Sequence, residues 1–191
     1  MNREHWLQNG RHSGLHRDLQ NVRNVMSPNF SERPAGTQID LLVIHNISLP
    51  PGQYGGSWID DLFCNQLDPA AHPYFRDIAD LRVSAHALID RHGQLTQYVA
   101  FDKKAWHAGQ SCFDGRQQCN DFSIGIELEG CDDEPFTDAQ YQCLTALTRH
   151  LQEVYPAITL ARIVGHSDIA PDRKTDPGPC FDWRRYKKAI T

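Results

Sequence analysis

Two stretches of the chain carry the pattern of strands buried inside a sheet. Residues 39–47, IDLLVIHNI, form a run dominated by aliphatic side chains, which is typical of a central strand covered on both faces. Residues 122–130, FSIGIELEG, alternate instead, so that the large apolar side chains share one face while Gly125, Glu127 and Glu129 share the other. Because Gly125 leaves room beside Glu127, this second face predicts the floor of a cleft; the alternative is an exposed face with two solvated glutamates.

The remaining pattern alternates strands with helices. Residues 83–89 and 94–101 predict two strands joined by a turn in which Gly93 supplies a positive φ. Residues 137–154 predict the longest helix, because they begin with a capping box and then repeat apolar residues at three- and four-residue steps. The other predicted elements are a helix at 58–64 capped by Ser57, a strand at 163–166 and a helix at 183–190 capped by Asp182. Together they indicate an α/β or α+β fold, with a central mixed sheet flanked by helices.

Length and polarity divide the chain into an arm and one domain. A chain of 191 residues suits a single domain that buries a full core. Residues 1–36 are polar and irregular and end in a turn-rich segment, apart from a short helical pattern at 15–22. We therefore expect an N-terminal arm at 1–36 that packs on the core, and a domain at 37–191 that contains the sheet.

Composition argues against several classes of protein. The net charge of −5 disfavours a general nucleic-acid binder, and the chain has no apolar run of about 18 residues that could span a membrane. The segment from Met1 to Leu19 lacks the apolar core of a secretory signal, so we expect a cytoplasmic protein. The six cysteines are then expected to be free thiols, and none forms the Cys-x-x-Cys pair of a zinc ribbon. We expect a monomer without nucleic-acid or membrane partners.

Candidate chemistry is concentrated in the loop GHSDIAPDRKTDPGP at residues 165–179. Its prolines exclude a continuous helix and stiffen the loop, so that Lys174 and Asp176, two residues apart, can face the same pocket. His166 follows a short apolar run, and His45 stands at the end of the first buried strand. Plainer interpretations exist: a salt-bridged surface loop with an unrelated histidine, and a core histidine whose hydrogen bonds are satisfied.

One hypothesis is a hydrolytic zinc site formed by His45, His166 and Asp176. Two imidazole nitrogens and a carboxylate leave a fourth position for water, as in catalytic zinc sites. Zinc lowers the pKa of that water toward ~7 and polarises a carbonyl group, so an amide bond could be hydrolysed at neutral pH. Glu127 would take the proton and Lys174 would stabilise the oxyanion. The same ligand types also hold iron(II) in oxygenases, which have no obvious need of Glu127 and Lys174.

Several segments of the chain resemble those of the AmpD-type N-acetylmuramoyl-L-alanine amidases. They are LLVIHNISLPPG (41–52), LRVSAH (81–86), AWHAG (105–109), CNDFSIGIELEG (119–130), YPAI (155–158), GHSDIAPDRKTDPGP (165–179) and FDW (181–183). The resemblance implies the fold shared with phage amidases and peptidoglycan recognition proteins. It also implies a zinc enzyme whose substrate is a 1,6-anhydromuropeptide, cleaved between the lactyl group of 1,6-anhydro-N-acetylmuramic acid and L-alanine during peptidoglycan recycling.

The resemblance also implies roles for individual residues. His45, His166 and Asp176 would bind zinc, and zinc-bound water would attack the scissile carbonyl. Glu127 would act as general base and acid, and Lys174 would stabilise the oxyanion.

The resemblance carries over to the substrate contacts as well. Asn46 and Arg82 match positions that face the muropeptide, and an arginine suits the carboxylates of the peptide. Trp106 and His107 are expected to form the wall of the sugar site. One rival interpretation is a binding module that has lost the metal and kept the groove, although every ligand and catalytic position is filled here. Another is a periplasmic amidase with broader substrates, which would need an export signal.

Overall fold

The computed structural model describes residues 6, 7, 19 and 22–191. The short helix expected at 15–22 lies outside this described part, except for residues 19 and 22. The described chain contains a six-stranded sheet with the order β1-β5-β4-β9-β3-β10. Its strands are β1 (Arg23–Asn24), β3 (Leu41–Ile47), β4 (Ala87–Ile89), β5 (Leu95–Gln97), β9 (Ser123–Glu129) and β10 (Ile163–Gly165).

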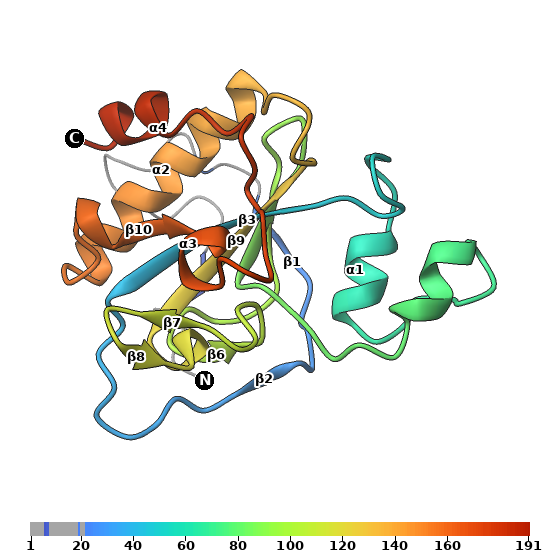
Figure 1. Ribbon diagram of the computed structural model, residues 1–191, viewed down its shortest axis with the longest axis horizontal. Helices are drawn as coiled ribbons and strands as arrows, with labels where there is room; N and C mark the ends of the chain where they lie inside the picture. The colour runs from blue at the N-terminus through green and yellow to red at the C-terminus, as the bar shows by residue number, and fades with distance from the viewer. Residues whose placement is uncertain (1–5, 8–18, 20–21) are drawn as a thin grey trace.

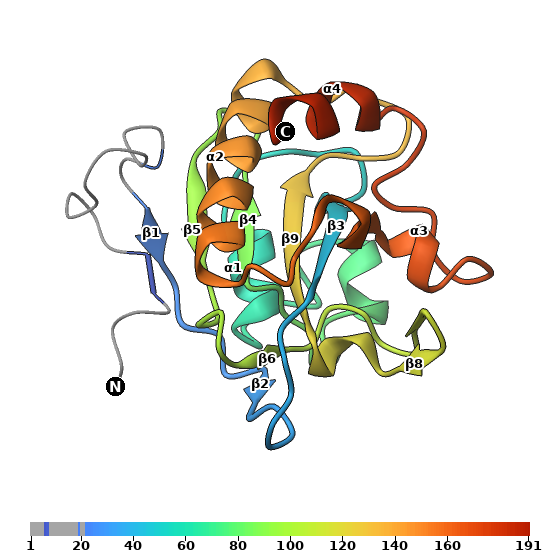
Figure 2. The same ribbon diagram turned by 90° about the vertical axis from the view of Figure 1, so that its left-hand side faces the viewer.

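The sheet is mixed, as the sequence predicts. β9 pairs in parallel with both β3 and β4, and β10 continues the sheet in parallel beyond β3. Toward the other edge, β5 runs antiparallel to β4 and β1 runs parallel to β5. Figure 2 shows the long strands β9 and β3 side by side in the middle of the protein.

The two faces of the long strands have different surroundings. Alternate side chains of β3 and β9, such as Ile44 and Ile126, are fully buried in the main apolar core. On the opposite face, the register pairs His45 with Glu127. Every residue of β9 is buried, and Glu127 is only 9% exposed, so the interpretation of this face as solvated is wrong.

Helices cover both sides of the sheet. α2 (Asp138–Val154) and α4 (Trp183–Ala189) lie side by side and close the main apolar core (Figure 1). α1 (Trp58–Phe63) and the 3-10 helix η2 (Pro73–Asp77) build a second apolar cluster. α3 (His166–Ile169) is a single turn that follows β10. Among the described helices, none is long and apolar enough to cross a membrane.

Two of the three predicted helix caps are confirmed. Thr137 and Gln140 form a reciprocal capping box at the start of α2, and Asp182 accepts a hydrogen bond from the first turn of α4. The predicted cap at Ser57 is wrong, since its hydroxyl donates to the Asp61 carboxylate instead of accepting from a main-chain amide. A charged acceptor one turn away competes well for a hydroxyl proton.

The predicted hairpin is present but shorter than expected. β4 and β5 are three-residue strands joined by a turn in which Gly93 has a φ of 81°. Residues 83–86 lie outside the strand: the main-chain amide of Ser84 donates to Trp106, and only His86, through its bond to Gly125 of β9, still contacts the sheet. Alternation continues in the sequence beyond the residues that pair in the ladder.

Short elements complete the described chain. β2 pairs with β6, and β7 pairs with β8, both antiparallel. Their bounds, with those of the 3-10 helices η3 and η4, are β2 (Phe30–Ser31), β6 (Lys104–Ala105), β7 (Cys112–Phe113), β8 (Arg116–Gln117), η3 (Cys119–Asp121) and η4 (Leu160–Arg162). Residues 22–36, the described part of the expected arm, are attached to the rest of the protein through β1 and β2.

Candidate active site

Three side chains from distant parts of the sequence meet beside the parallel strands. Nδ1 of His45 on β3 lies 3.0 Å from Nδ1 of His166 and 3.0 Å from Oδ2 of Asp176. Nδ1 of His166 and Oδ2 of Asp176 are 3.1 Å apart. His166 begins α3 directly after β10, the neighbour of β3, and Asp176 lies in the loop that follows. The structure therefore brings together the three residues predicted as metal ligands.

The protonation of this cluster suits a cation. Nε2 of His166 lies 3.1 Å from the carbonyl oxygen of Ala108, which only accepts, so this nitrogen carries a proton and Nδ1 is the ring atom that can bind a metal. Burial lowers the pKa of His45 to about 4, so its imidazole is neutral at pH 7. Two imidazole nitrogens and a carboxylate oxygen therefore converge, and a cation between them would satisfy all three.

The spacing of the cluster fits zinc. Separations of 3.0 to 3.1 Å are close to the ~3.3 Å expected between neighbouring ligands of a tetrahedral zinc ion. Two nitrogens and one oxygen are also a donor set that catalytic zinc sites use. The residues present therefore fit the metal that the sequence led us to expect.

Glu127 lies on the same face of the sheet as His45, its partner in the β3–β9 register. Among the described residues, its buried Oε2 has no hydrogen-bond partner. Burial raises the pKa of Glu127 well above its ordinary value; the negative charge of Asp176 adds to this shift and the positive charge of Lys174 opposes it. A carboxyl group with a raised pKa and an unpartnered oxygen is suited to exchange protons with a bound ligand.

The second glutamate of β9 has a structural position. The carboxylate of Glu129 accepts hydrogen bonds from the main-chain amides of Gly55 and Arg91. Glu129 therefore holds two loops together, and its oxygens are occupied. The alternation of β9 placed both glutamates on one face, but it could not separate their tasks.

The cluster opens into a cavity of about 440 Å³. Lys174 and Asp176 both line it, as the sequence predicts for residues two apart in the stiff loop. The side of the cavity formed by α1 and η2 is apolar and includes Leu62, Tyr74 and Ile78. The cavity thus combines a charged floor with an apolar wall, which is typical of a small-molecule site.

Three of the four predicted substrate-binding residues line this cavity, and Arg82 does not. Asn46 and Trp106 line the cavity. His107 also borders it, but its Nδ1 lies 2.9 Å from Nε2 of His45 and its Nε2 lies 3.1 Å from Oγ of Ser123. Arg82 is exposed and is not among the residues that line this cavity. The substrate roles of these residues stay a prediction.

Asp132 is a cavity residue that the sequence analysis missed. Nδ2 of Asn46 donates to Oδ1 of Asp132 at 2.7 Å and to the carbonyl oxygen of Pro177 at 3.1 Å. Because the amide nitrogen of Asn46 is engaged in this way, its amide oxygen is the atom left to accept from a ligand. Asp132 follows the carboxyl end of β9. A position at the end of a buried strand was the reason for selecting His45, and the same criterion could have identified Asp132.

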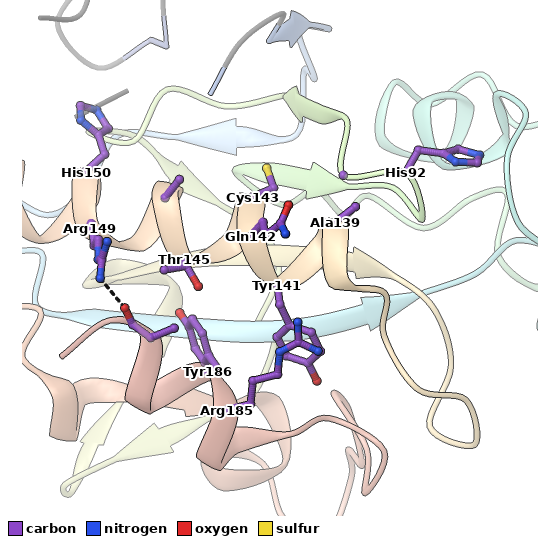
Figure 3. A pocket seen from close by; sticks show the side chains of 13 residues that line it. His92, Ala139, Tyr141, Gln142, Cys143, Thr145, Arg149, His150, Arg185 and Tyr186 are labelled. Carbon is purple, nitrogen blue, oxygen red and sulfur yellow. Dashed lines mark hydrogen bonds between the residues drawn. The ribbon is translucent and has the colours of Figure 1, made fainter. Parts of the chain in front are cut away.

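A larger hollow of about 830 Å³ lies between α2, α4 and the turn at Gly93. Figure 3 shows Arg149 on its border, bonded to the carbonyl group of Ala189. Arg185, on the same border, pairs with Asp138. The cations of this hollow are thus held by the protein itself, whereas the His-His-Asp cluster lies in the smaller cavity. The smaller cavity is the candidate active site.

Known proteins are similar to this chain in both sequence and fold. A family model described as N-acetylmuramoyl-L-alanine amidase matches residues 35–179. The chain belongs to the N-acetylmuramoyl-L-alanine amidase family. The expected fold and enzyme class are thereby confirmed.

Relatives of this amidase agree over most of its length. The 1,6-anhydro-N-acetylmuramyl-L-alanine amidase AmpD of Escherichia coli (strain K12) is 59% identical over 173 residues, which cover 91% of this chain and 94% of that protein. AmpD of Haemophilus influenzae is 57% identical over 172 residues, with 90% and 94% covered.

Solved structures agree as well. The crystal structure of a selenomethionine AmpD derivative has a TM-score of 0.87 at 59% identity and covers 89% of this amidase and 94% of that chain. AmiD from Escherichia coli, solved in complex with the substrate anhydro-N-acetylmuramic acid-L-Ala-D-γ-Glu-L-Lys, has a TM-score of 0.60 at 30% identity, with 83% of this chain and 60% of that chain covered.

Proposed function

We propose that this amidase hydrolyses the amide bond between the lactyl group of 1,6-anhydro-N-acetylmuramic acid and L-alanine in muropeptides, with zinc held by His45, His166 and Asp176. The observation that carries the proposal is the convergence of two imidazole nitrogens and a carboxylate in the same cavity as the buried Glu127. The choice of substrate is supported by relatives that are named for this bond and by the substrate bound to AmiD.

The chain's own residues would divide the work of hydrolysis. A zinc ion in the cluster would supply an activated water and polarise the scissile carbonyl group. Glu127 accepts the proton of the attacking water and returns it to the leaving amine, a task for which its raised pKa is suited. Lys174 donates a hydrogen bond to the oxyanion, and such a donor typically lowers the barrier by ~2.7 to 4 kcal/mol.

We also infer that the reaction takes place in the cytoplasm, as a step of peptidoglycan recycling. All six cysteines of the chain are free. Free thiols are typical of proteins kept in a reducing compartment, whereas exported proteins tend to pair them.

Mass spectrometry of anhydromuramyl-tripeptide incubated with the purified protein tests the proposal. We expect free tripeptide and free anhydro-sugar, loss of both products after chelation, and their return when zinc is added. Metal analysis of the same preparation should find zinc and not iron. Intact substrate in the presence of bound zinc would contradict the proposal and favour a binding module.

Asp176→Ala tests the ligand assignment. The variant should lose zinc and activity together, because a three-ligand site that loses its carboxylate no longer holds the metal tightly. Asp172→Ala removes an exposed carboxylate from the same loop and should keep both. Stoichiometric zinc in Asp176→Ala would show that Asp176 is not a ligand.

A further inference from the structure

Both imidazoles of the cluster are held from behind by two consecutive residues. Nε2 of His45 lies 2.9 Å from Nδ1 of His107, and Nε2 of His166 lies 3.1 Å from the carbonyl oxygen of Ala108. These two residues are themselves fixed by Asn120, whose Oδ1 accepts the main-chain amide of His107 at 3.1 Å and that of Ala108 at 2.8 Å. One side-chain oxygen therefore holds the segment that contacts both ligands.

The ring of His107 is also fixed by β9. Its Nε2 lies 3.1 Å from Oγ of Ser123, and its plane meets that of His45 at 83° with the ring centroids 5.0 Å apart. A Cβ atom on Gly125 would lie 2.4 Å from Cγ of His107, so only glycine leaves space for this ring. The room that the sequence offered to a ligand at Gly125 is thus taken by an imidazole.

The hydrogen bonds around His45, His107 and His166 are consistent when each ring carries its proton on Nε2. The Ala108 carbonyl only accepts, so His166 carries its proton on Nε2. When a cation in the cluster takes the lone pair of Nδ1 of His45, the proton of that ring belongs on Nε2 and is donated to Nδ1 of His107. His107 then carries its proton on Nε2, where Ser123 can accept it.

We propose that His107 and Ala108, held by Asn120, are positioning groups that fix the ring orientation and the tautomer of both ligand histidines. The inference rests on the proposed zinc site and goes beyond it, because it moves His107 from the sugar wall to the support of the metal. Partners that hold the outer nitrogen of a ligand histidine typically change metal affinity by about 10- to 100-fold.

The unchanged protein offers a direct test. Long-range ¹H–¹⁵N correlation spectra of the histidine rings, recorded on ¹⁵N-labelled protein loaded with zinc, distinguish a proton on Nδ1 from one on Nε2. We expect the proton on Nε2 in His45, His107 and His166. A proton on Nδ1 of His107 would overturn the proposal, and the result does not depend on whether the protein cleaves a muropeptide.

Matched variants of His107 give a second test. His107→Asn places an amide oxygen near the position of Nδ1, whereas His107→Leu has a similar size and no acceptor. Zinc affinity is measured by competition with a chelator. It should fall about 10- to 100-fold in the leucine variant and by no more than about threefold in the asparagine variant. Urea unfolding of the metal-free variants should show similar stabilities. Equal zinc affinities in the two variants would overturn the proposal.

Asn120 allows a second pair of matched variants, at a residue that holds the main chain of His107 and Ala108. Asn120→Asp keeps an oxygen that can accept both main-chain amides, and Asn120→Leu removes it. We expect the same split in zinc affinity, and this pair decides the matter if His107→Leu does not fold. Zinc affinity that is unchanged in Asn120→Leu would show that the segment needs no such anchor. Failure of the proposed amidase reaction would leave these zinc affinities measurable, so the two failures are distinguishable.

Discussion

Glu127 is the residue at which catalysis can be separated from metal binding. It lies in the cavity with the cluster but is not one of the three converging ligands. Glu127→Gln should therefore keep zinc and lower kcat by at least ~100-fold, because the amide cannot take a proton from water. Glu134→Gln, which changes an exposed carboxylate, should leave kcat unchanged. Near-normal turnover in Glu127→Gln would exclude Glu127 as the general base.

The raised pKa of Glu127 also predicts a pH-dependent stability in the metal-free protein. A carboxyl group whose pKa is raised by folding favours the folded state at low pH, and this contribution is lost as pH rises through the raised pKa. Glutamine does not titrate, so Glu127→Gln should gain stability over the unchanged protein as pH rises from about 4 to about 8. Urea unfolding of chelated protein across this range measures the difference. A difference independent of pH would mean that the pKa of Glu127 is not raised.

Asp132 is predicted to act on the substrate through Asn46. It accepts from the amide nitrogen of Asn46 and so leaves the amide oxygen toward the cavity. Asp132→Ala removes a hydrogen bond to a charged group, worth roughly 1.5 to 3 kcal/mol, and should raise KM about tenfold or more with a smaller change in kcat. Asp133→Ala removes the adjacent exposed carboxylate and should change neither constant. An unchanged KM in Asp132→Ala would remove Asn46 from the list of substrate contacts.

At the scale of residues, the sequence predicted the groups that stand at the ends of strands. His45 and His166 were selected from ten histidines because buried strands precede them and because the segments around them resemble the amidase family, which also implies Asp176 as the third ligand. The support of His45 by His107 could not be found in this way. It depends on which side chain lies behind another across the sheet, and spacing along the chain does not contain that information.

Among the elements, α2 has the start that is best defined by its sequence. The hydroxyl of Thr137 accepts a hydrogen bond from the main-chain amide of Gln140, and the side-chain oxygen of Gln140 accepts one from the main-chain amide of Thr137. Thr137→Ala should destabilise the protein by about 1 kcal/mol and lower Tm by roughly 2 to 4 °C. Thr137→Ser keeps the hydroxyl and is the control; calorimetry of both variants is the measurement. Equal Tm values for the two variants would mean that the cap contributes nothing.

Most elements were predicted closely, including the short helices α1 and α4, whereas the two hairpin strands were not. β3, β9 and α2 end within a few residues of the predicted limits, because each presents several periods of a clear pattern. β4 and β5 are each three residues long, much shorter than the strands predicted at 83–89 and 94–101. The strand predicted at 163–166 ends at Gly165, and His166 begins the single turn of α3. The loop after α3 is held against this turn by a hydrogen bond from the main-chain amide of Ser167 to the carbonyl oxygen of Asp176.

At the scale of the whole molecule, Arg33 joins the segment 22–36 to the surroundings of the active site. Its guanidinium donates to the main-chain carbonyl oxygens of Phe101, Asp102, Asn120, Asp121 and Ser123. Burial lowers the pKa of Arg33 to about 10, which leaves it charged at neutral pH. Two of these carbonyl groups belong to Asn120 and Ser123, the residues that hold His107 from either side.

Arg33→Met should therefore be among the most damaging substitutions outside the cavity. Several partly buried carbonyl groups lose their donor, at about 1 to 3 kcal/mol for each group left unsatisfied, so the free energy of unfolding should fall by about 3 kcal/mol or more. Arg23→Met, in the same segment, breaks a pair with Asp60 in which the arginine is 48% exposed, and should cost no more than about 1 kcal/mol.

Urea unfolding of the two metal-free variants measures this contrast, and chelator competition measures its effect on the site. Because Arg33 bonds to the main chain of Asn120 and Ser123, we expect Arg33→Met to weaken zinc binding and Arg23→Met to leave it unchanged. Equal losses of stability would mean that β1 and β2 are enough to hold the segment. A stability loss without a change in zinc affinity would confine Arg33 to the fold, whereas loss of both would make residues 22–36 part of the structure that shapes the active site.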